Sequence, residues 1–196
     1  MNDNMTARAY EFAKAAHGSI KQLRKYSNEP YITHLEEVCR ILESAGETDQ
    51  DVLAAALLHD VIDDVFPHKP EYGPLQIKEL FGDRVLEMVY DLTKVFTHEN
   101  FPGINRSDRK DLEAEIISKI SDNSLKIRLA DMIHNSGDIA KNDPGFASIY
   151  LKEMRKILDL LTPRMKASSN SLLLTLWHKT KSQIEYYESE WKGRQS

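Results

Sequence analysis

Residues 52–64 form an apolar run with helical spacing that ends in four polar side chains, His59, Asp60, Asp63 and Asp64. Residues four apart share a helix face, so this run predicts that His59 aligns with Asp63 and Asp60 with Asp64. Three carboxylates and an imidazole at the end of a buried helix are costly to desolvate unless something offsets their charge. A bound divalent cation offsets it and also activates water. The run therefore favours a metal-dependent enzyme, and the alternative is a solvent-facing helix end.

The rest of the chain repeats helical spacing of apolar residues, as in Val85, Met88 and Val89. No alternating strand pattern persists and no internal repeat is found. A length of 196 residues suits one domain with a substantial core. The sequence predicts an all-α helical bundle, with a single domain over residues 1–165 and an extra C-terminal helical extension over 166–196. The apolar and aromatic residues of that extension cover either the core or a second copy, so a homo-oligomer stays open.

Charge and cysteine content narrow the class of protein. The formal net charge of −5 argues against a general nucleic-acid or other polyanion binder. The single cysteine, Cys39, excludes an intrachain disulfide framework and a cysteine-based zinc cluster. No apolar run is long enough for a membrane span and no signal peptide is recognisable, so we expect a cytoplasmic protein with no membrane partner.

A metal site needs more ligands than His59 and Asp60. His34 and Asp131 are the candidates: His34 lies at the first turn of a helix capped by Thr33, and Asp131 is a polar residue set into an apolar helical stretch. Two imidazoles and two carboxylates leave coordination positions for water. Such nitrogen and oxygen ligands suit Mn, Fe, Co or Zn better than Ca, and the sequence does not choose among them. The remaining histidines are expected at the surface or at helix caps: His17, His68, His98, His134 and His178.

A basic segment precedes His34. Arg24 and Lys25 form a local anion clamp in one interpretation, because both side chains grip phosphate oxygens well. The alternative is a solvated helix C-terminus. Asn135 lies four residues after Asp131 and shares its helix face, so it is expected to line the same pocket.

Several ordered motifs together resemble the HD-domain metal phosphohydrolases, and more specifically the hydrolase domain of the RelA/SpoT family, which includes small stand-alone alarmone hydrolases. The resemblance covers roughly residues 5–140. The motifs are Gln22-x-Arg24-Lys25, Glu29-Pro30-Tyr31-Ile32-x-His34, Ala55-Ala56-Leu57-Leu58-His59-Asp60-Val61-Ile62-Asp63-Asp64, Phe81-Gly82-x-x-Val85 with Leu92-Thr93-Lys94, and Ile127-x-Leu129-Ala130-Asp131-x-x-x-Asn135.

The resemblance implies a role for each candidate residue. It implies one Mn²⁺ held by four ligands, and a catalytic pair that orients or deprotonates the attacking water. It also implies substrate contacts to phosphates, base and nucleoside. The implied ligands are His34, His59, Asp60 and Asp131; the catalytic pair is Asp63 and Asp64; the substrate-binding residues are Arg24, Lys25 and Asn135.

The resemblance implies a hydrolase activity that belongs to the stringent response. The reaction is hydrolysis of guanosine tetra- or pentaphosphate, (p)ppGpp, at the 3′-pyrophosphate, giving GDP or GTP and pyrophosphate. Two alternatives remain. One is an HD phosphohydrolase acting on another phosphorylated nucleotide, such as the 2′-phosphate of NADPH. The other is a catalytically weak nucleotide-binding regulatory module.

The chain departs from the family pattern in four places. Asp63 stands where the family usually has Glu, and Leu35 stands where it usually has Pro. Extra residues also separate His17 from Gln22, and Lys25 from Pro30, which predicts a reshaped pocket wall.

Overall fold

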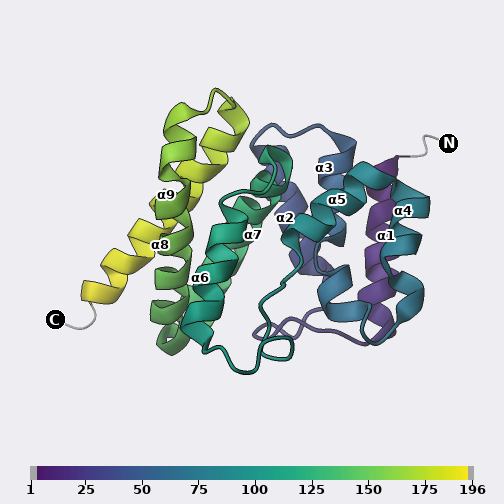
Figure 1. Ribbon diagram of the computed structural model, residues 1–196, viewed down its shortest axis with the longest axis horizontal. Helices are drawn as coiled ribbons and strands as arrows, with labels where there is room; N and C mark the ends of the chain where they lie inside the picture. The colour runs from purple at the N-terminus through teal and green to yellow at the C-terminus, as the bar shows by residue number, and fades with distance from the viewer. Residues whose placement is uncertain (1–3, 194–196) are drawn as a thin grey trace. The chain divides into compact units, whose positions relative to one another are not determined.

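The computed structural model describes residues 4–193, and the elements of this part are helices, as predicted (Figure 1). The helices are α1 (Met5–Ser19), α2 (Ile32–Ser44), α3 (Gln50–Leu58), α4 (Pro74–Phe81), α5 (Asp83–Leu92), α6 (Arg106–Ile117), α7 (Asp122–Asn142), α8 (Pro144–Ala167) and α9 (Ser171–Gly193). A π-helical turn, η1 (Val61–Val65), and a 3-10 turn, η2 (Pro70–Tyr72), lie between α3 and α4.

The described chain divides into two compact units. The first contains residues 4–93 and 121–128, and the second contains residues 94–120 and 129–193. Helix α7 begins in the first unit and continues into the second. The predicted division at residues 165 and 166 stays a prediction.

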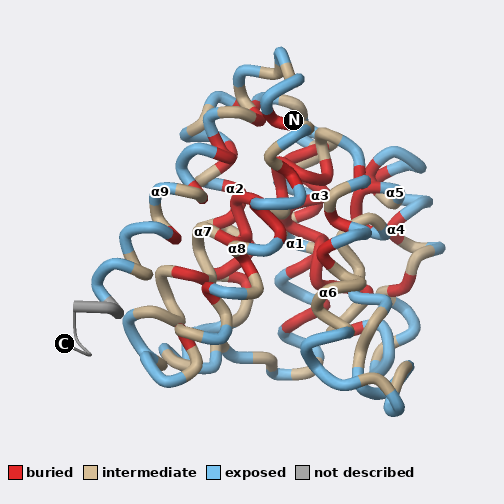
Figure 2. Tube along the Cα trace, turned by 60° about the vertical axis from the view of Figure 1, so that its left-hand side comes forward, coloured by how far each residue is buried: buried red, intermediate tan, exposed pale blue. Residues whose placement is uncertain are grey.

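Helix α3 is the centre of the first unit. Every residue from Val52 to Leu58 is buried, and α3 packs against α1, α2 and α5 (Figure 2). A helix that is apolar on all sides belongs inside a core. Helix α1 meets it with the fully buried alanines Ala9, Ala13 and Ala16, whose small side chains let helices approach closely. Leu58→Ala is therefore expected to cost about 2–5 kcal/mol.

The predicted continuous helix over residues 52–64 is wrong. Helix α3 ends at Leu58, and Asp60 has φ −98° and ψ −1°, outside ideal helical geometry. The next turn is wider, because the N–H of Phe66 donates to the carbonyl of Val61 at 3.0 Å, five residues back. Turns of this π type are frequent at functional sites. The N–H of Asp64 still donates to the carbonyl of Asp60 at 2.9 Å, four residues back, so the segment combines α-type and π-type hydrogen bonds.

The start of α7 is fixed within the first unit by polar contacts. Lys126 donates to Glu47, and both side chains are buried, with exposed fractions of 8% and 6%. The hydroxyl of Ser124 donates to Oδ2 of Asp91 at 2.6 Å. Removing one partner of a buried ion pair typically costs about 3–5 kcal/mol. These contacts hold the first turns of α7 against α5 and the loop before α3.

The second unit is built on the pairing of α8 with α9 and of α6 with α8. Leu158, Leu161, Leu173 and Leu176 are buried along this pairing. Arg155 of α8 donates to Glu188 of α9 at 2.7 Å. The predicted C-terminal helix is thus α9, packed on its own unit.

Candidate metal centre and active site

His59 follows directly after α3 and is only 5% exposed. Its Nδ1 lies 2.7 Å from the carbonyl oxygen of Ala56. Because a carbonyl oxygen only accepts hydrogen bonds, Nδ1 carries the proton, and in the neutral ring Nε2 keeps its lone pair. Nε2 faces Oδ2 of Asp60 at 3.2 Å. A backbone hydrogen bond of this kind commonly fixes the orientation of a metal-binding histidine.

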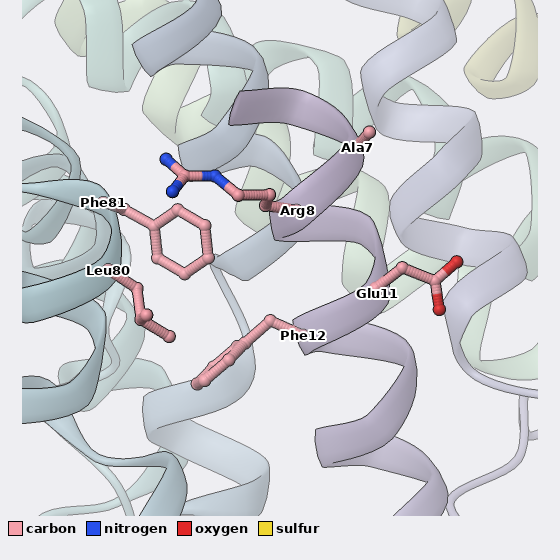
Figure 3. Close-up of a pocket in the computed structure, with 6 residues that line it drawn as sticks. All are labelled: Ala7, Arg8, Glu11, Phe12, Leu80 and Phe81. Carbon is pink, nitrogen blue, oxygen red and sulfur yellow. The ribbon is translucent and has the colours of Figure 1, made fainter. Parts of the chain in front are cut away.

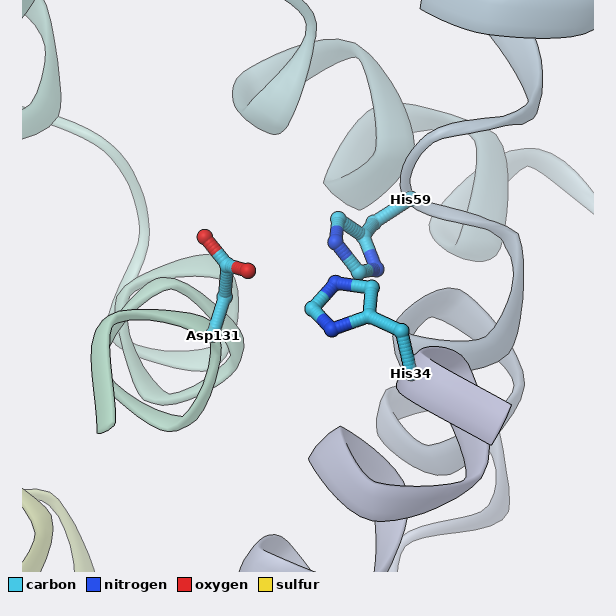
Figure 4. Close-up of side chains that lie close together, drawn as sticks. All are labelled: His34, His59 and Asp131. Atoms are coloured by element: carbon cyan, nitrogen blue, oxygen red, sulfur yellow. The ribbon is translucent and has the colours of Figure 1, made fainter. Parts of the chain in front are cut away.

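His34 comes from the first turn of α2 and is 1% exposed. Its Nε2 lies 3.7 Å from the same oxygen of Asp60. Figure 4 shows the rings of His34 and His59 edge to face, with centroids 5.5 Å apart. One nitrogen from each ring lies within 4.8 Å of the other. The first unit therefore gathers three of the four predicted ligands, His34, His59 and Asp60.

This donor set fits a divalent cation. Two imidazole nitrogens and a carboxylate oxygen are buried together, and the lone pair of a neutral His59 faces the electron-rich Asp60 oxygen. A cation between these atoms turns repulsion into attraction. Nitrogen and oxygen donors without sulfur suit a first-row divalent metal.

Tyr31 is a site residue to which sequence reasoning assigned no role. Its hydroxyl donates to Oδ2 of Asp60 at 2.6 Å. Its ring lies edge-on to His34, with centroids 5.5 Å apart. A donor to a ligating carboxylate orients that carboxylate and tunes its affinity for metal. The available signal was the position of Tyr31 in the same motif as His34.

His17 was expected at the surface, and this prediction is wrong. It is buried on α1, with an exposed fraction of 1%. Its Nδ1 lies 2.6 Å from Oε1 of Gln22, and the amide Nε2 of Gln22 donates to Oδ2 of Asp64 at 2.8 Å. The ring also stacks on Tyr31, with centroids 4.7 Å apart and planes at 27°. Helical spacing with Ala13 and Ala16 was the signal for its burial.

The extra residues between His17 and Gln22 form a tight turn. Lys21 adopts a left-handed conformation, with φ +53°, and the N–H of Gln22 donates to the carbonyl of His17 at 3.0 Å. The longer connection therefore returns Gln22 to the His17 ring.

Burial lowers the pKa of His17 below its ordinary value of 6.5. The hydrogen bond that His17 donates to Gln22, and the charges of Asp60 and Asp64, oppose this effect but do not reverse it. The ring is therefore neutral at neutral pH.

Asp63 and Asp64 lie on η1 and are both half-buried. Gln22 holds Asp64, whereas Tyr31 holds Asp60. The carboxylates of Asp60 and Asp64, four residues apart, thus accept hydrogen bonds from different side chains.

The predicted anion clamp lies on a turn that precedes α2. The N–H of Arg24 donates to the carbonyl of Glu29 at 2.8 Å. The Arg24 guanidinium lies 5.9 Å from the centre of the Tyr31 ring, a cation–π distance that keeps this charge beside the site. Lys25 is exposed, and its Nζ donates to the hydroxyl of Tyr26 at 3.1 Å. Arg24 therefore lies against the site tyrosine.

Asp131 and Asn135 lie on α7, in the second unit. Asp131 is 5% exposed and accepts a hydrogen bond from Nδ2 of Asn135. Helix α9 supports this stretch, because Gln183 Nε2 donates to the carbonyl of Ile133 at 2.6 Å and to the hydroxyl of Ser136 at 2.8 Å. The role of Asp131 as a fourth ligand and that of Asn135 in substrate binding stay predictions.

A separate groove of about 470 Å³ lies in the first unit (Figure 3). Its lining residues are Ala7, Arg8, Glu11, Phe12, Leu80 and Phe81. Its exposed lining is almost entirely apolar, and the Arg8 guanidinium lies 5.9 Å from the centre of the Phe81 ring. It contains none of the candidate site residues. None of the described helices is both long and apolar enough to cross a membrane.

Comparison with known proteins places this geometry in a family. A family model described as HD domain matches residues 9–164. The chain is 34% identical over 132 residues to the guanosine-3′,5′-bis(diphosphate) 3′-pyrophosphohydrolase MESH1 of Drosophila melanogaster, covering 66% of this chain and 68% of that protein. It is 33% identical over 141 residues to the GTP pyrophosphokinase rsh of Brucella ovis, but spans only 17% of that longer protein.

A solved structure agrees. The chain matches a metazoan ortholog of SpoT, described as hydrolysing ppGpp, with a TM-score of 0.71 and 27% identity over 93% of this chain and 97% of the other. The predicted all-α HD-domain fold is confirmed by the family match and by this structure. Because the HD-domain model matches most of its length, the chain belongs to the HD-domain family.

Proposed function

We propose that this chain is a (p)ppGpp hydrolase that removes the 3′-pyrophosphate of guanosine tetra- or pentaphosphate, giving GDP or GTP and pyrophosphate. The observation that carries the proposal is the buried trio of His34, His59 and Asp60 beside the half-buried Asp64. The similarity to MESH1 and to the SpoT ortholog supports the same substrate.

We propose Asp131 as the fourth ligand. It is buried, and it lies five residues after Lys126 on the unbroken helix α7, roughly 7.5 Å further along the axis. At the start of that helix, Lys126 donates to Glu47 and Ser124 donates to Asp91. The hydrogen bond from Asn135 orients its carboxylate.

The residues divide the chemistry. His34, His59, Asp60 and Asp131 would hold a divalent cation, which would supply Lewis acidity toward a phosphoryl oxygen and toward water. Asp63 and Asp64 orient the attacking water and accept its proton. Arg24, with the more exposed Lys25, offsets charge on the substrate's phosphates. Asn135 contacts the nucleoside.

The activity test uses purified protein with Mn²⁺ and ppGpp. We expect stoichiometric release of pyrophosphate and GDP, and loss of release when EDTA is added. His59→Ala should abolish turnover, whereas the matched variant His68→Ala, at an exposed histidine, should keep it. Parallel reactions with pppGpp and NADPH test the substrate. No turnover of ppGpp by protein with metal bound would overturn the proposal.

We propose Mn²⁺ as the metal, because the resemblance to the RelA/SpoT-type hydrolases implies it and the nitrogen and oxygen donor set is compatible with it. Metal-free protein reconstituted with Mn²⁺, Zn²⁺, Co²⁺, Fe²⁺ or Mg²⁺ should be most active with Mn²⁺. A higher turnover with any of the others would replace this assignment while leaving the substrate assignment in place.

A further inference from the structure

We propose that His17 is a positioning residue for Asp64, acting through the side-chain amide of Gln22. The inference rests on the proposed function, in which Asp64 handles the attacking water. It assigns a role to a buried imidazole that lies outside the predicted ligand set.

The direction of the hydrogen bonds carries the argument. The amide of Gln22 has an oxygen end that accepts and a nitrogen end that donates. Oε1 lies 2.6 Å from Nδ1 of His17, so the imidazole must donate there. The nitrogen end then faces Asp64 and donates to its Oδ2 at 2.8 Å.

This direction matters for proton transfer. A carboxylate that accepts a hydrogen bond from an amide N–H is held in place and keeps other lone pairs free to accept a proton from water. If the Gln22 amide turned over, its oxygen would face a carboxylate oxygen of Asp64, and neither atom could donate. The Nδ1–H of His17 prevents that reversal, because this donor needs an acceptor and only the oxygen of the Gln22 amide can accept its hydrogen bond.

Burial and ring stacking hold the His17 side chain in place for this contact. It lies on α1 in the same buried row as Ala13 and Ala16. Its face stacks on Tyr31, whose hydroxyl holds Asp60. Within the described residues, Nε2 of His17 is buried and has no hydrogen-bond partner. Such an atom calls for an explanation, and the requirement for Nδ1–H at Gln22 supplies one.

Two substitutions separate the donor from the ring. His17→Asn keeps an N–H donor close to the position of Nδ1 but removes the ring. His17→Phe keeps a ring that can stack on Tyr31 but removes the donor. If His17 only filled space, Phe would be the better replacement; if it orients Gln22, Asn would be.

The kinetic test measures kcat, KM and Mn²⁺ affinity for wild type and both variants, corrected for the folded fraction. We expect His17→Phe to lower kcat about tenfold or more with KM and metal affinity little changed, as orienting partners typically do. His17→Asn should recover most of that loss. Gln22→Leu should match His17→Phe, and the double variant should be no worse than either, because both remove the same interaction.

A second measurement does not depend on activity. In ¹⁵N-edited NMR of the wild type near neutral pH, the His17 ring should carry its proton on Nδ1, and Gln22→Leu should abolish that preference. If the wild type does not hydrolyse ppGpp but His17 shows the Nδ1–H form, the proposed function fails and the hydrogen-bond direction stands. A proton on Nε2, or equal kcat losses in His17→Asn and His17→Phe, would overturn the inference about His17.

Discussion

The hydroxyl of Tyr31 and Oδ2 of Asp60 are joined by a 2.6 Å hydrogen bond, and the same oxygen faces both His34 and His59. One oxygen of Asp60 therefore faces the Tyr31 hydroxyl and two buried imidazoles. The tyrosine holds that atom in place, because it donates the hydrogen bond and its own ring is packed against His34.

Tyr31→Phe is predicted to weaken metal binding. The substitution keeps the ring and removes only the donor to Asp60, so the carboxylate loses its orientation. We expect the Mn²⁺ dissociation constant to rise about tenfold, the lower end for loss of such a partner. Titration monitored by electron paramagnetic resonance of free Mn²⁺ measures this. A matched control is Tyr26→Phe, whose hydroxyl contacts Lys25 instead. Equal affinities for wild type and Tyr31→Phe would contradict the role.

Asp60 and Asp63 are predicted to fail in different ways. Asp60→Ala should lose bound metal, because it removes an oxygen that faces both histidines. Asp63→Ala should retain metal and lower kcat by about a hundredfold, a typical effect of losing a proton-handling group. Metal content after gel filtration and steady-state kinetics separate the outcomes. Equal metal loss in both variants would refute the division of roles.

Cys39 is predicted to be chemically inert in the folded protein. Burial, followed by the charge of Glu43, raises the pKa of its thiol to about 12. Since the thiolate is the reactive form and an ordinary cysteine has a pKa near ~8.5, alkylation at pH 8 should be at least ~100-fold slower than in urea. Mass spectrometry of iodoacetamide-treated protein follows one site, because the chain has a single cysteine. Equal rates in the native and unfolded states would show that the thiol is accessible.

Gln183→Ala is predicted to destabilise the second unit. It removes hydrogen bonds from α9 to Ile133 and Ser136 on α7, so the free energy of unfolding should fall by about 1–2 kcal/mol. Ser182→Ala, at an exposed neighbour on the same helix, should change it by less than about 0.5 kcal/mol. Urea denaturation compares them; a similar loss for both would point to helix propensity instead.

The buried His17 predicts a pH dependence of stability. Because its pKa is lowered in the folded state, the unfolded chain binds more protons once the pH falls below about 6.5, and stability then decreases. Wild type should therefore lose more free energy of unfolding than His17→Asn between pH 7 and pH 5.5. Urea denaturation at each pH measures both slopes, and parallel slopes would contradict the lowered pKa. The charged and titratable neighbours Asp60, Asp64 and His59 are common to both proteins.

The sequence predicted the chemical types of the site residues more fully than it predicted their arrangement in space. His59 and Asp60 were recognisable because polar side chains at the end of an apolar helix are costly to bury, whereas His34 was selected at the first turn of a capped helix; the fold brings these three together. The hydrogen bond from Gln22 to Asp64 joins residues 42 apart, and no local pattern encodes such a pairing. The buried state of His17 was missed because its neighbours Gly18 and Ser19 are exposed and polar. The π turn was missed because π and α turns have the same composition and differ in hydrogen-bond spacing alone.

The π turn at Val61–Val65 makes the length of this segment part of the site. Deleting one residue there, such as Ile62, would let the chain continue as a regular α-helix. All of the proposed ligands and catalytic residues would still be present in the sequence. It would also turn Asp63 and Asp64 by about 100° around the axis, away from Gln22. Homologues aligned on His59-Asp60 alone can thus share all the named residues. A one-residue gap in the π turn would still change the arrangement of those residues and therefore the function.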